Sequence, residues 1–260
     1  MLSKKNNIYL EIGNLKVSYN HKPRIIAEIG INHSGSLDTA KQLADLAAES
    51  GADVIKSQFH IPSEEMSPSA KNVIPPHTNK SIYEIMQDCC LTPEEEYKFK
   101  VHIENLGKEY LCTPFSSKAA HLLGEMNVSS FKIGSGECSN EAVLEAAASY
   151  GKPLIISTGM NTIKSVKQTC KFVEKFIGNK FFLMHTTNLY PTPYHLVRLG
   201  GINELQDLVG LSRVGLSDHT ESNLACLGAI ANGAVLIERH FTDSKERQGP
   251  DIINLSLIHI

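Results

Sequence analysis

Short apolar segments alternate with amphipathic stretches along this chain, and the alternation repeats eight times. Each apolar segment is rich in β-branched residues, ends in polar residues and leads into a Gly, Ser, Asn or Pro turn. This pattern predicts parallel strands joined by helices, an α/β fold, and eight repeats favour a closed (β/α)8 TIM barrel. The predicted strands, some with the start of the next loop, are 24–30, 52–58, 110–115, 130–137, 152–160, 180–188, 213–220 and 234–242.

A doubly wound parallel sheet is the competing architecture. It normally carries a glycine-rich phosphate-binding turn after its first strand. The segment that ends the first predicted strand reads E-I-G-I-N-H-S-G and lacks that pattern. A chain of 260 residues also suits one barrel, which commonly has about 250 residues. We therefore expect the barrel.

The two ends of the chain are expected to differ from a regular barrel. Residues 8–20 contain a G-N turn and are predicted to form a hairpin that plugs the amino-terminal end, which divides the chain into a hairpin (1–22) and a barrel (23–260). The short segment after Thr242 contains Gly and Pro and does not predict a helix. We therefore expect a barrel that lacks its last helix and is truncated at its carboxyl end.

Two local signals lie between the second and third predicted strands. The segment after residue 58 is rich in proline and predicts a long loop, and long loops are often functional. Thr92 then begins T-P-E-E, which places proline at the first helical position and Glu95 three residues after the cap. This spacing predicts a helix that starts with a capping box.

Composition argues against several classes of protein. The formal net charge is −3 and the isoelectric point is about 6.4, so nothing favours general binding to nucleic acid or to anionic membranes. No apolar run approaches the roughly 18 residues that span a bilayer, and we expect a cytoplasmic protein. The cysteines form no C-x-x-C pair and are interpreted as reduced thiols: Cys89, Cys90, Cys112, Cys138, Cys170 and Cys226.

Polar side chains gather where the predicted strands end. In a parallel barrel the carboxyl ends of all strands share one face, so residues far apart in sequence converge there. The repeated placement therefore predicts one site at that face. Its candidates are Glu28, Lys56, Gln58, Thr113, Lys132, Ser135, Ser157, Thr158, Asn188, Tyr190, Ser217, Asp218, His219, Glu238 and His240.

Two histidines close neighbouring predicted strands. His219 and His240 could both reach one metal ion, and imidazole suits first-row metals while leaving positions for water and substrate. The alternative is that both are ordinary polar residues at the rim of the barrel. His33, His185 and Glu238 are further candidate ligands, although His185 could instead form a hydrogen bond within the site.

Two lysines and a glutamate lie in strands that otherwise face the interior. Lys56 and Lys132 predict a phosphate or carboxylate ligand, because a buried ammonium group is costly without an anion. Alternatively, the lysines pair with Glu28, Glu137 or Asp218 in a structural network. Glu28 could act as a general base or face a cationic transition state, or it could simply form a salt bridge with Lys56.

The ordered motifs resemble those of the N-acetylneuraminate synthase family, which includes sialic, legionaminic and pseudaminic acid synthases and spore coat polysaccharide synthases. The resemblance covers about residues 8–256. One departure is Ser57, where the family often has an aromatic residue. The motifs are A-E-I-G-I-N-H-S-G (27–35), K-S-Q (56–58), T-P-F (113–115), K-I-G-S-G-E (132–137), S-T-G-M (157–160), Y-P-T-P (190–193), G-L-S-D-H-T (215–220), E-R-H-F-T (238–242) and G-P-D (249–251).

The resemblance implies condensation of phosphoenolpyruvate with an N-acylated amino sugar, with release of phosphate. His219 and His240 would hold Mn²⁺ or Mg²⁺, and Glu28 would stabilise the cationic centre or guide water. Tyr190 and Asp251 would contact the sugar, and family members are expected to form homodimers completed by a carboxyl-terminal domain. Phosphoenolpyruvate would be held by Lys56, Lys132, Ser135, Ser157, Asn188 and Ser217, with Thr113 nearby; Gln58 is a further substrate-binding candidate.

Two other interpretations remain open. The expected truncation suggests a non-catalytic remnant, or a subunit that another chain completes. A different metal-dependent barrel, such as a sugar epimerase or an aldolase, is disfavoured by the ordered motifs and by the lack of a dense carboxylate metal site.

Overall fold

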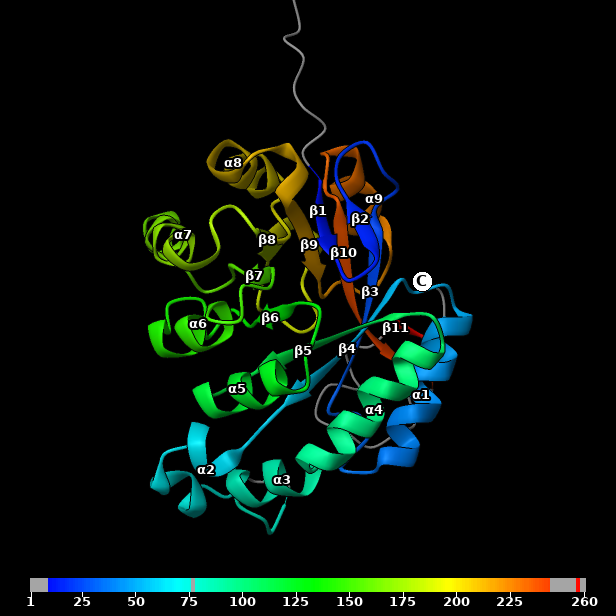
Figure 1. The fold of residues 1–260 in the computed structure, drawn as a ribbon, viewed down its shortest axis with the longest axis vertical. Helices are drawn as coiled ribbons and strands as arrows, with labels where there is room; N and C mark the ends of the chain where they lie inside the picture. Colours follow the sequence, from blue (N-terminus) through cyan, green and yellow to red (C-terminus); the bar gives the residue numbers. More distant parts are fainter. Residues whose placement is uncertain (1–8, 76–77, 244–255, 258–260) are drawn as a thin grey trace, which may run out of the picture.

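The computed structural model describes residues 9–75, 78–243 and 256–257. Eight parallel strands, with helices packed around them, form a nearly closed barrel, so the predicted fold class is confirmed (Figure 1). The strand order is β5-β4-β3-β10-β9-β8-β7-β6, and β5 lies beside β6 at the seam. Within the described residues, no ladder hydrogen bonds join this last pair. No helix in this part of the chain is both long and apolar enough to cross a membrane.

The barrel strands follow the predicted segments closely. The first, β3, has the predicted bounds, whereas the last, β10, begins two residues later than predicted. A further short strand, β11 (Ser256–Leu257), pairs in parallel with the end of β10. The barrel strands are β3 (Arg24–Gly30), β4 (Val54–Phe59), β5 (Glu109–Pro114), β6 (Phe131–Ile133), β7 (Leu154–Ser157), β8 (Phe181–Thr186), β9 (Val214–Asp218) and β10 (Leu236–Thr242).

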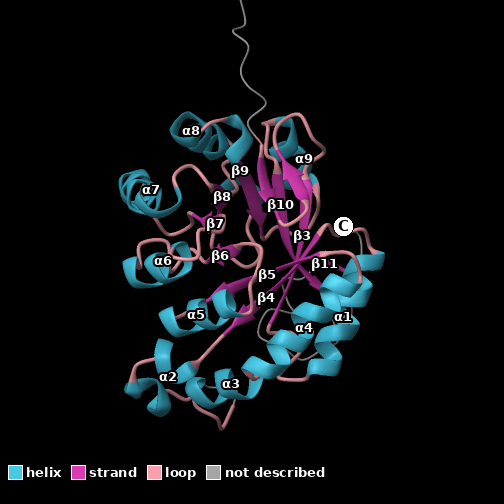
Figure 2. Ribbon diagram, in the orientation of Figure 1, coloured by secondary structure: helices cyan, strands magenta, loops and turns pink. Residues whose placement is uncertain are grey.

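The helices cover the outer face of the barrel (Figure 2). Their apolar faces pack on the outward side chains of the strands and form the larger of two apolar clusters. The helices are α1 (Leu37–Glu49), α2 (Pro62–Glu65), α3 (Ile82–Cys89), α4 (Pro93–Asn105), α5 (Ser117–Glu125), α6 (Glu141–Ala148), α7 (Ile163–Ile177), α8 (Gly200–Val209) and α9 (Leu224–Ala231), and the 3₁₀ turns are Pro68–Asn72, Tyr194–Leu196 and Leu211–Arg213.

Capping signals explain several helix boundaries. Thr92 accepts a hydrogen bond from the Glu95 backbone and forms the expected capping box at the start of α4. The segment after residue 58 is not the uniform loop that we predicted, because it contains α2, a 3₁₀ turn and α3. Ser81 and Glu84 form a second capping box there, a signal that proline content concealed.

The amino-terminal hairpin consists of β1 (Leu10–Ile12) and β2 (Leu15–Val17). Ile12 and Val17 are buried in a second apolar cluster, together with inward-facing side chains from the early part of the barrel strands. The hairpin therefore closes the amino-terminal end of the barrel, as expected; the division of the chain into domains at residue 22 stays a prediction. The expected loss of the last helix concerns residues outside the described ones.

Polar side chains form the next layer inside the barrel. Successive inward positions on a strand are two residues apart, so the residue two beyond each apolar inward position also points inward. Ile26 is followed in this way by Glu28, and Val54 by Lys56. The same step leads from Leu111, Ile155 and Leu236 to Thr113, Ser157 and Glu238. Inside the barrel, a layer of polar side chains therefore follows a layer of apolar side chains.

Candidate active site

Two lysines and two glutamates form a buried charge network in this polar layer. Lys56 Nζ lies 2.7 Å from Glu28 Oε2 and 3.6 Å from Glu238 Oε1. Lys132 Nζ lies 3.4 Å from the same Glu238 oxygen and donates a hydrogen bond to Ser157 Oγ at 2.8 Å. Each of the four charged residues is at most 3% exposed. The structure therefore brings the two predicted lysines together, on either side of one carboxylate.

Glu238 is the residue whose role sequence reasoning underestimated. Its sequence position predicts a strand-end residue and a spare metal ligand, yet it contacts both lysines and accepts a hydrogen bond from Ser217 Oγ at 3.3 Å. The lysines pair with Glu28 and Glu238, not with Glu137 or Asp218. A signal existed, because Glu238 lies two residues before His240 and so faces the same side of the strand.

The charges of this network follow from their neighbours. Burial alone would lower the pKa of Lys56, but the carboxylates of Glu238 and Glu28 outweigh it and raise that pKa. Burial lowers the pKa of Lys132, assisted by the nearby Lys56, although Glu238 opposes the shift. Burial would raise the pKa of Glu238, but Lys132 and Lys56 lower it. A second anion near the lysines therefore has to compete with Glu238 for them.

Both carboxylate oxygens of Glu28 are engaged. Oε2 contacts Lys56 as described, and Oε1 accepts a hydrogen bond from Gln58 Nε2 at 2.7 Å. The alternative of a salt bridge between Glu28 and Lys56 is therefore realised in the structure. Two partners hold the carboxylate in one orientation, which suits a fixed negative charge better than a mobile proton acceptor.

The two histidines lie side by side, with ring centroids 5.4 Å apart. Burial, followed by the neighbouring His240, lowers the pKa of His219 to about 3, so its ring is neutral near pH 7. His219 Nδ1 donates to the carbonyl oxygen of Thr187 at 2.8 Å, which leaves the lone pair on Nε2. Neutral imidazoles oriented by a carbonyl are typical metal ligands.

This donor set fits a divalent metal in part. Among the described residues, no group of three His, Cys, Asp or Glu side chains forms a metal cage. Two protein ligands would therefore leave positions for substrate oxygen and water, as a catalytic metal requires. The ring of Tyr190, whose centroid is 4.0 Å from that of His219, covers the pair on one side.

Ser135 and Asn188 approach each other across a glycine. A Cβ atom at Gly159 would lie 1.7 Å from Asn188 Oδ1 and 2.8 Å from Ser135 Oγ. Asn188 Oδ1 is buried and has no hydrogen-bond partner among the described residues. Gly159 thus leaves room for two predicted substrate-binding side chains, one of which presents an unsatisfied polar atom.

The remaining predicted residues differ in what they contact. Thr113 Oγ1 accepts a hydrogen bond from Lys56 Nζ at 3.3 Å, so it belongs to the charge network. Thr158, a suggested part of the anion cradle, instead donates its hydroxyl to the Met184 carbonyl oxygen at 3.0 Å. Asp251 lies outside the described residues. The assignment of individual residues to substrate stays a prediction.

Outward-facing polar residues support the strands that carry the site. Arg239, between Glu238 and His240, donates to the backbone carbonyls of Ser222 and Thr220. Ser57, between Lys56 and Gln58, donates to Glu96 Oε1 on α4 at 2.7 Å. The departure from the family at residue 57 therefore points away from the cavity.

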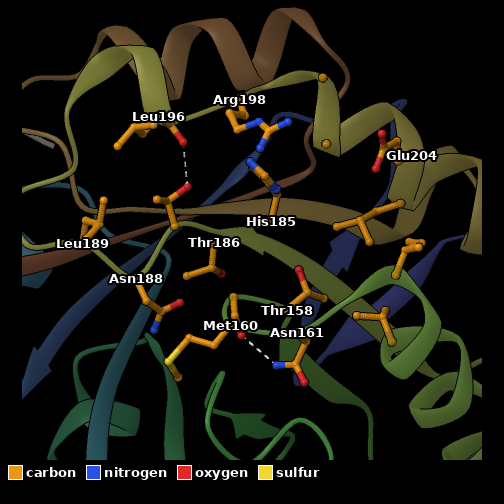
Figure 3. A pocket seen from close by; sticks show the side chains of 17 residues that line it. Thr158, Met160, Asn161, His185, Thr186, Asn188, Leu189, Leu196, Arg198 and Glu204 are labelled. Atoms are coloured by element: carbon orange, nitrogen blue, oxygen red, sulfur yellow. Dashed lines mark hydrogen bonds between the residues drawn. The ribbon is translucent and has the colours of Figure 1, made fainter.

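A cavity of about 850 Å³ adjoins the site between the ends of β7 and β8 and helix α8 (Figure 3). Asn188 belongs to its wall, whereas His185 and Arg198 line the side near α8. His185 Nε2 donates to the Val197 carbonyl oxygen at 2.7 Å, so this histidine points away from His219 and does not join the pair. Of the site residues predicted from the sequence, Thr158, His185 and Asn188 line this cavity.

Comparison with known proteins is consistent with this geometry. Residues 43–257 match the NeuB family. The chain belongs to the NeuB family. It is 35% identical over 244 residues to the N,N'-diacetyllegionaminic acid synthase of Campylobacter jejuni, covering 88% of this chain and 70% of that protein. It is 33% identical over 236 residues to the human N-acetylneuraminate-9-phosphate synthase, covering 89% of this chain and 65% of that protein.

Solved structures of NeuB-like proteins have the same fold. The N-acetylneuraminic acid synthetase of Leptospira borgpetersenii superimposes with a TM-score of 0.87 at 27% identity, covering 97% of this chain and 84% of that one. A spore coat polysaccharide biosynthesis protein of Bacillus subtilis gives 0.82 at 30% identity, covering 96% and 68%. This NeuB-family chain spans about two thirds of the length of the curated relatives that it matches.

Proposed function

We propose that this chain catalyses condensation of phosphoenolpyruvate with an N-acylated amino sugar, giving a nonulosonic acid and phosphate. The observation that carries the proposal is the position of two buried ammonium groups in the same strand-end layer as a pair of neighbouring imidazole rings. Lys56 and Lys132 suit an anionic donor, and the histidine pair suits an oxygen-containing acceptor. The names of the relatives support an amino-sugar-derived product.

The reaction forms one carbon–carbon bond and breaks one carbon–oxygen bond. Carbon 3 of phosphoenolpyruvate attacks the aldehyde carbon of the acceptor, whose oxygen takes a proton. Positive charge develops at carbon 2, water adds there and loses a proton, and the tetrahedral intermediate expels phosphate. A divalent cation, Mn²⁺ or Mg²⁺, held by His219 and His240 would act as a Lewis acid towards the acceptor carbonyl.

Residues of the chain have separate tasks in this scheme. Lys56 and Lys132, with Ser135, Ser157 and Asn188, hold the phosphate and carboxylate groups of the donor. Glu28, fixed by Lys56 and Gln58, presents a negative charge to the developing cation. Tyr190, beside His219, contacts the sugar, and Thr113 and Ser217 orient Lys56 and Glu238.

The test combines the purified chain with phosphoenolpyruvate, Mn²⁺ and a panel of acceptors that includes N-acetylmannosamine and bacillosamine-type sugars. We expect phosphate release together with a product whose mass equals donor plus acceptor plus water minus phosphoric acid. His219→Ala should abolish both turnover and Mn²⁺ binding, whereas His121→Ala, on the exposed face of α5, should leave them unchanged.

Two outcomes would count against the proposal in different ways. If no acceptor releases phosphate although phosphoenolpyruvate binds, the chain is a remnant, or a subunit that another chain completes. If His219→Ala binds Mn²⁺ with unchanged affinity, the assignment of the histidine pair as ligands is wrong.

A further inference from the structure

A chain of hydrogen bonds runs from Glu28 out of the barrel to helix α2. Gln58 donates through Nε2 to Glu28 Oε1 at 2.7 Å, and its Oε1 lies 3.1 Å from His60 Nε2. His60 Nδ1 lies 2.8 Å from Glu65 Oε1, and the other oxygen of Glu65 accepts from the backbone of Ile61 at 3.4 Å. His60 and Glu65 are therefore linked to the reaction centre although neither reaches it.

The direction of each hydrogen bond follows from what the groups can donate. A carboxylate only accepts, so Gln58 must turn its NH₂ group towards Glu28, whose other oxygen is paired with Lys56. The amide oxygen of Gln58 then faces His60, and His60 Nε2 must donate. An ionised Glu65 likewise accepts, so His60 Nδ1 must donate as well. In this arrangement both ring nitrogens of His60 act as hydrogen-bond donors.

Neighbouring side chains enclose the ring of His60. His60 is 8% exposed and stacks on Phe115, with ring centroids 4.1 Å apart and an angle of 15° between the planes. Two titratable groups besides Glu65 interact electrostatically with His60: His33, after β3, and Glu96, on α4. Burial and then the charge of His60 lower the pKa of His33 to about 4, so His33 adds no second positive charge near pH 7.

We propose that Glu65 keeps His60 doubly protonated, and that His60 thereby fixes the amide of Gln58 in the orientation that holds Glu28. His60 and Glu65 are thus positioning residues, and the inference rests on the proposed function only for its kinetic consequence. If His60 lost the proton on Nε2, that nitrogen would accept, and the Gln58 amide would turn its oxygen towards Glu28. Two acceptors would then face each other, and Glu28 would lose one of its two anchors.

The variant Glu65→Gln tests this series of hydrogen bonds, because it keeps a side chain of nearly the same shape at residue 65. A glutamine can still accept from His60 Nδ1, but it no longer favours the imidazolium. We expect kcat of Glu65→Gln to fall about tenfold at pH 8 and to recover as pH is lowered towards 6, where histidine gains its second proton. KM for phosphoenolpyruvate should change less than about twofold, because the lysines are untouched.

Glu64→Gln is the matched control. Glu64 is the neighbouring residue on α2, and its exposed ion pair with Lys118 spans 3.4 Å. Its kcat should follow the wild-type pH profile. If Glu65→Gln also follows that profile, or loses activity equally at pH 6 and pH 8, the positioning role is wrong.

A measurement without substrate separates this inference from the proposed function. Nitrogen chemical shifts of the full chain, labelled with ¹⁵N-histidine and assigned by comparison with His60→Asn, report the protonation of each ring nitrogen. We expect both nitrogens of His60 to be protonated at pH 7.5 in the wild-type chain and only Nδ1 in Glu65→Gln. An unprotonated ring nitrogen in the wild-type chain would overturn the proposal, whether or not the chain is active.

Discussion

The guanidinium group of Arg239 lies 3.6 Å from the carboxylate of Asp218 on the outer side of two neighbouring strands. Each of these residues is followed directly by one of the paired histidines. Asp218 also accepts hydrogen bonds from the backbone and the hydroxyl of Thr220. The ion pair therefore connects β10 to the loop that carries His219.

Arg239→Met should destabilise the fold strongly. Removing one partner of a buried ion pair typically costs about 3–5 kcal/mol, because it leaves the other charge unpaired. Urea denaturation measures the free energy of unfolding. Arg213→Met is the control, because Arg213 is partly exposed and, among the described residues, its guanidinium hydrogen-bonds with Asn179; its effect should stay below about 1 kcal/mol. Equal losses in the two variants would contradict the anchoring role.

Glu238→Gln should strengthen the binding of anions. The substitution removes the negative charge that lies between Lys56 and Lys132, so an incoming phosphate no longer competes with it. We expect the Kd of phosphoenolpyruvate, measured by calorimetry, to fall about tenfold, which corresponds to about 1.4 kcal/mol. Without ligand the variant should melt at a lower temperature, and phosphate should restore much of the loss. Weaker binding than in the exposed control Glu125→Gln would refute this explanation.

Gly159→Ala should impair donor binding while sparing the fold. The added methyl group would collide with Asn188 and Ser135, both predicted to hold the donor. We expect KM for phosphoenolpyruvate to rise at least about tenfold, with a melting temperature within a few degrees of the wild-type value. Gly136→Ala is the matched control, since the nearest atom to its Cβ, Met160 Cε, is 4.0 Å away. An unchanged KM in Gly159→Ala would show that these side chains do not bind the donor.

Acid should destabilise the fold through His33. Burial, followed by the charge of His60, lowers the pKa of His33 from 6.5 to about 4. Below pH 6.5 the imidazole of His33 is protonated in the unfolded chain but stays neutral in the folded chain. The free energy of unfolding therefore decreases as the pH is lowered, until about pH 4. At pH 4.5 this costs about 2–3 kcal/mol relative to pH 7.5. His33→Gln should lose that much less stability between the two pH values in urea denaturation, and an identical loss would contradict the assignment.

The sequence predicted the parts of the site that depend on strand position alone. Residues at strand ends converge whatever their partners, so Lys56, Lys132 and the histidine pair could be located in advance. The central place of Glu238 could not, because which carboxylate meets which lysine depends on the register of β10 against β3 and of β3 against β4. Period-two alternation places Glu238 inside the barrel but does not select its neighbours.

Residues that act from the outer side were missed for a different reason. Arg239 and Glu65 look like ordinary charged residues in the sequence, because their importance comes from burial against one specific partner. The spacing of His60 from Glu65 has no helical or strand period that would signal contact. The helix over Ile82–Cys89 was missed although its capping box is visible at Ser81 and Glu84, since nearby prolines favoured a loop.

The hairpin formed by β1 and β2 packs its buried side chains against the amino-terminal layer of the barrel interior. Because Ile12 and Val17 fill that end, the substrates of the proposed reaction would enter at the carboxyl ends of the strands. A molecule bound at Lys56 and Lys132 would lie next to the apolar layer that includes Ile12 and Val17. It would be farther from the opening than a molecule bound at His219 and His240. In the proposed reaction the donor would then have to bind before the acceptor, so the hairpin at the far end of the barrel would impose an order of binding.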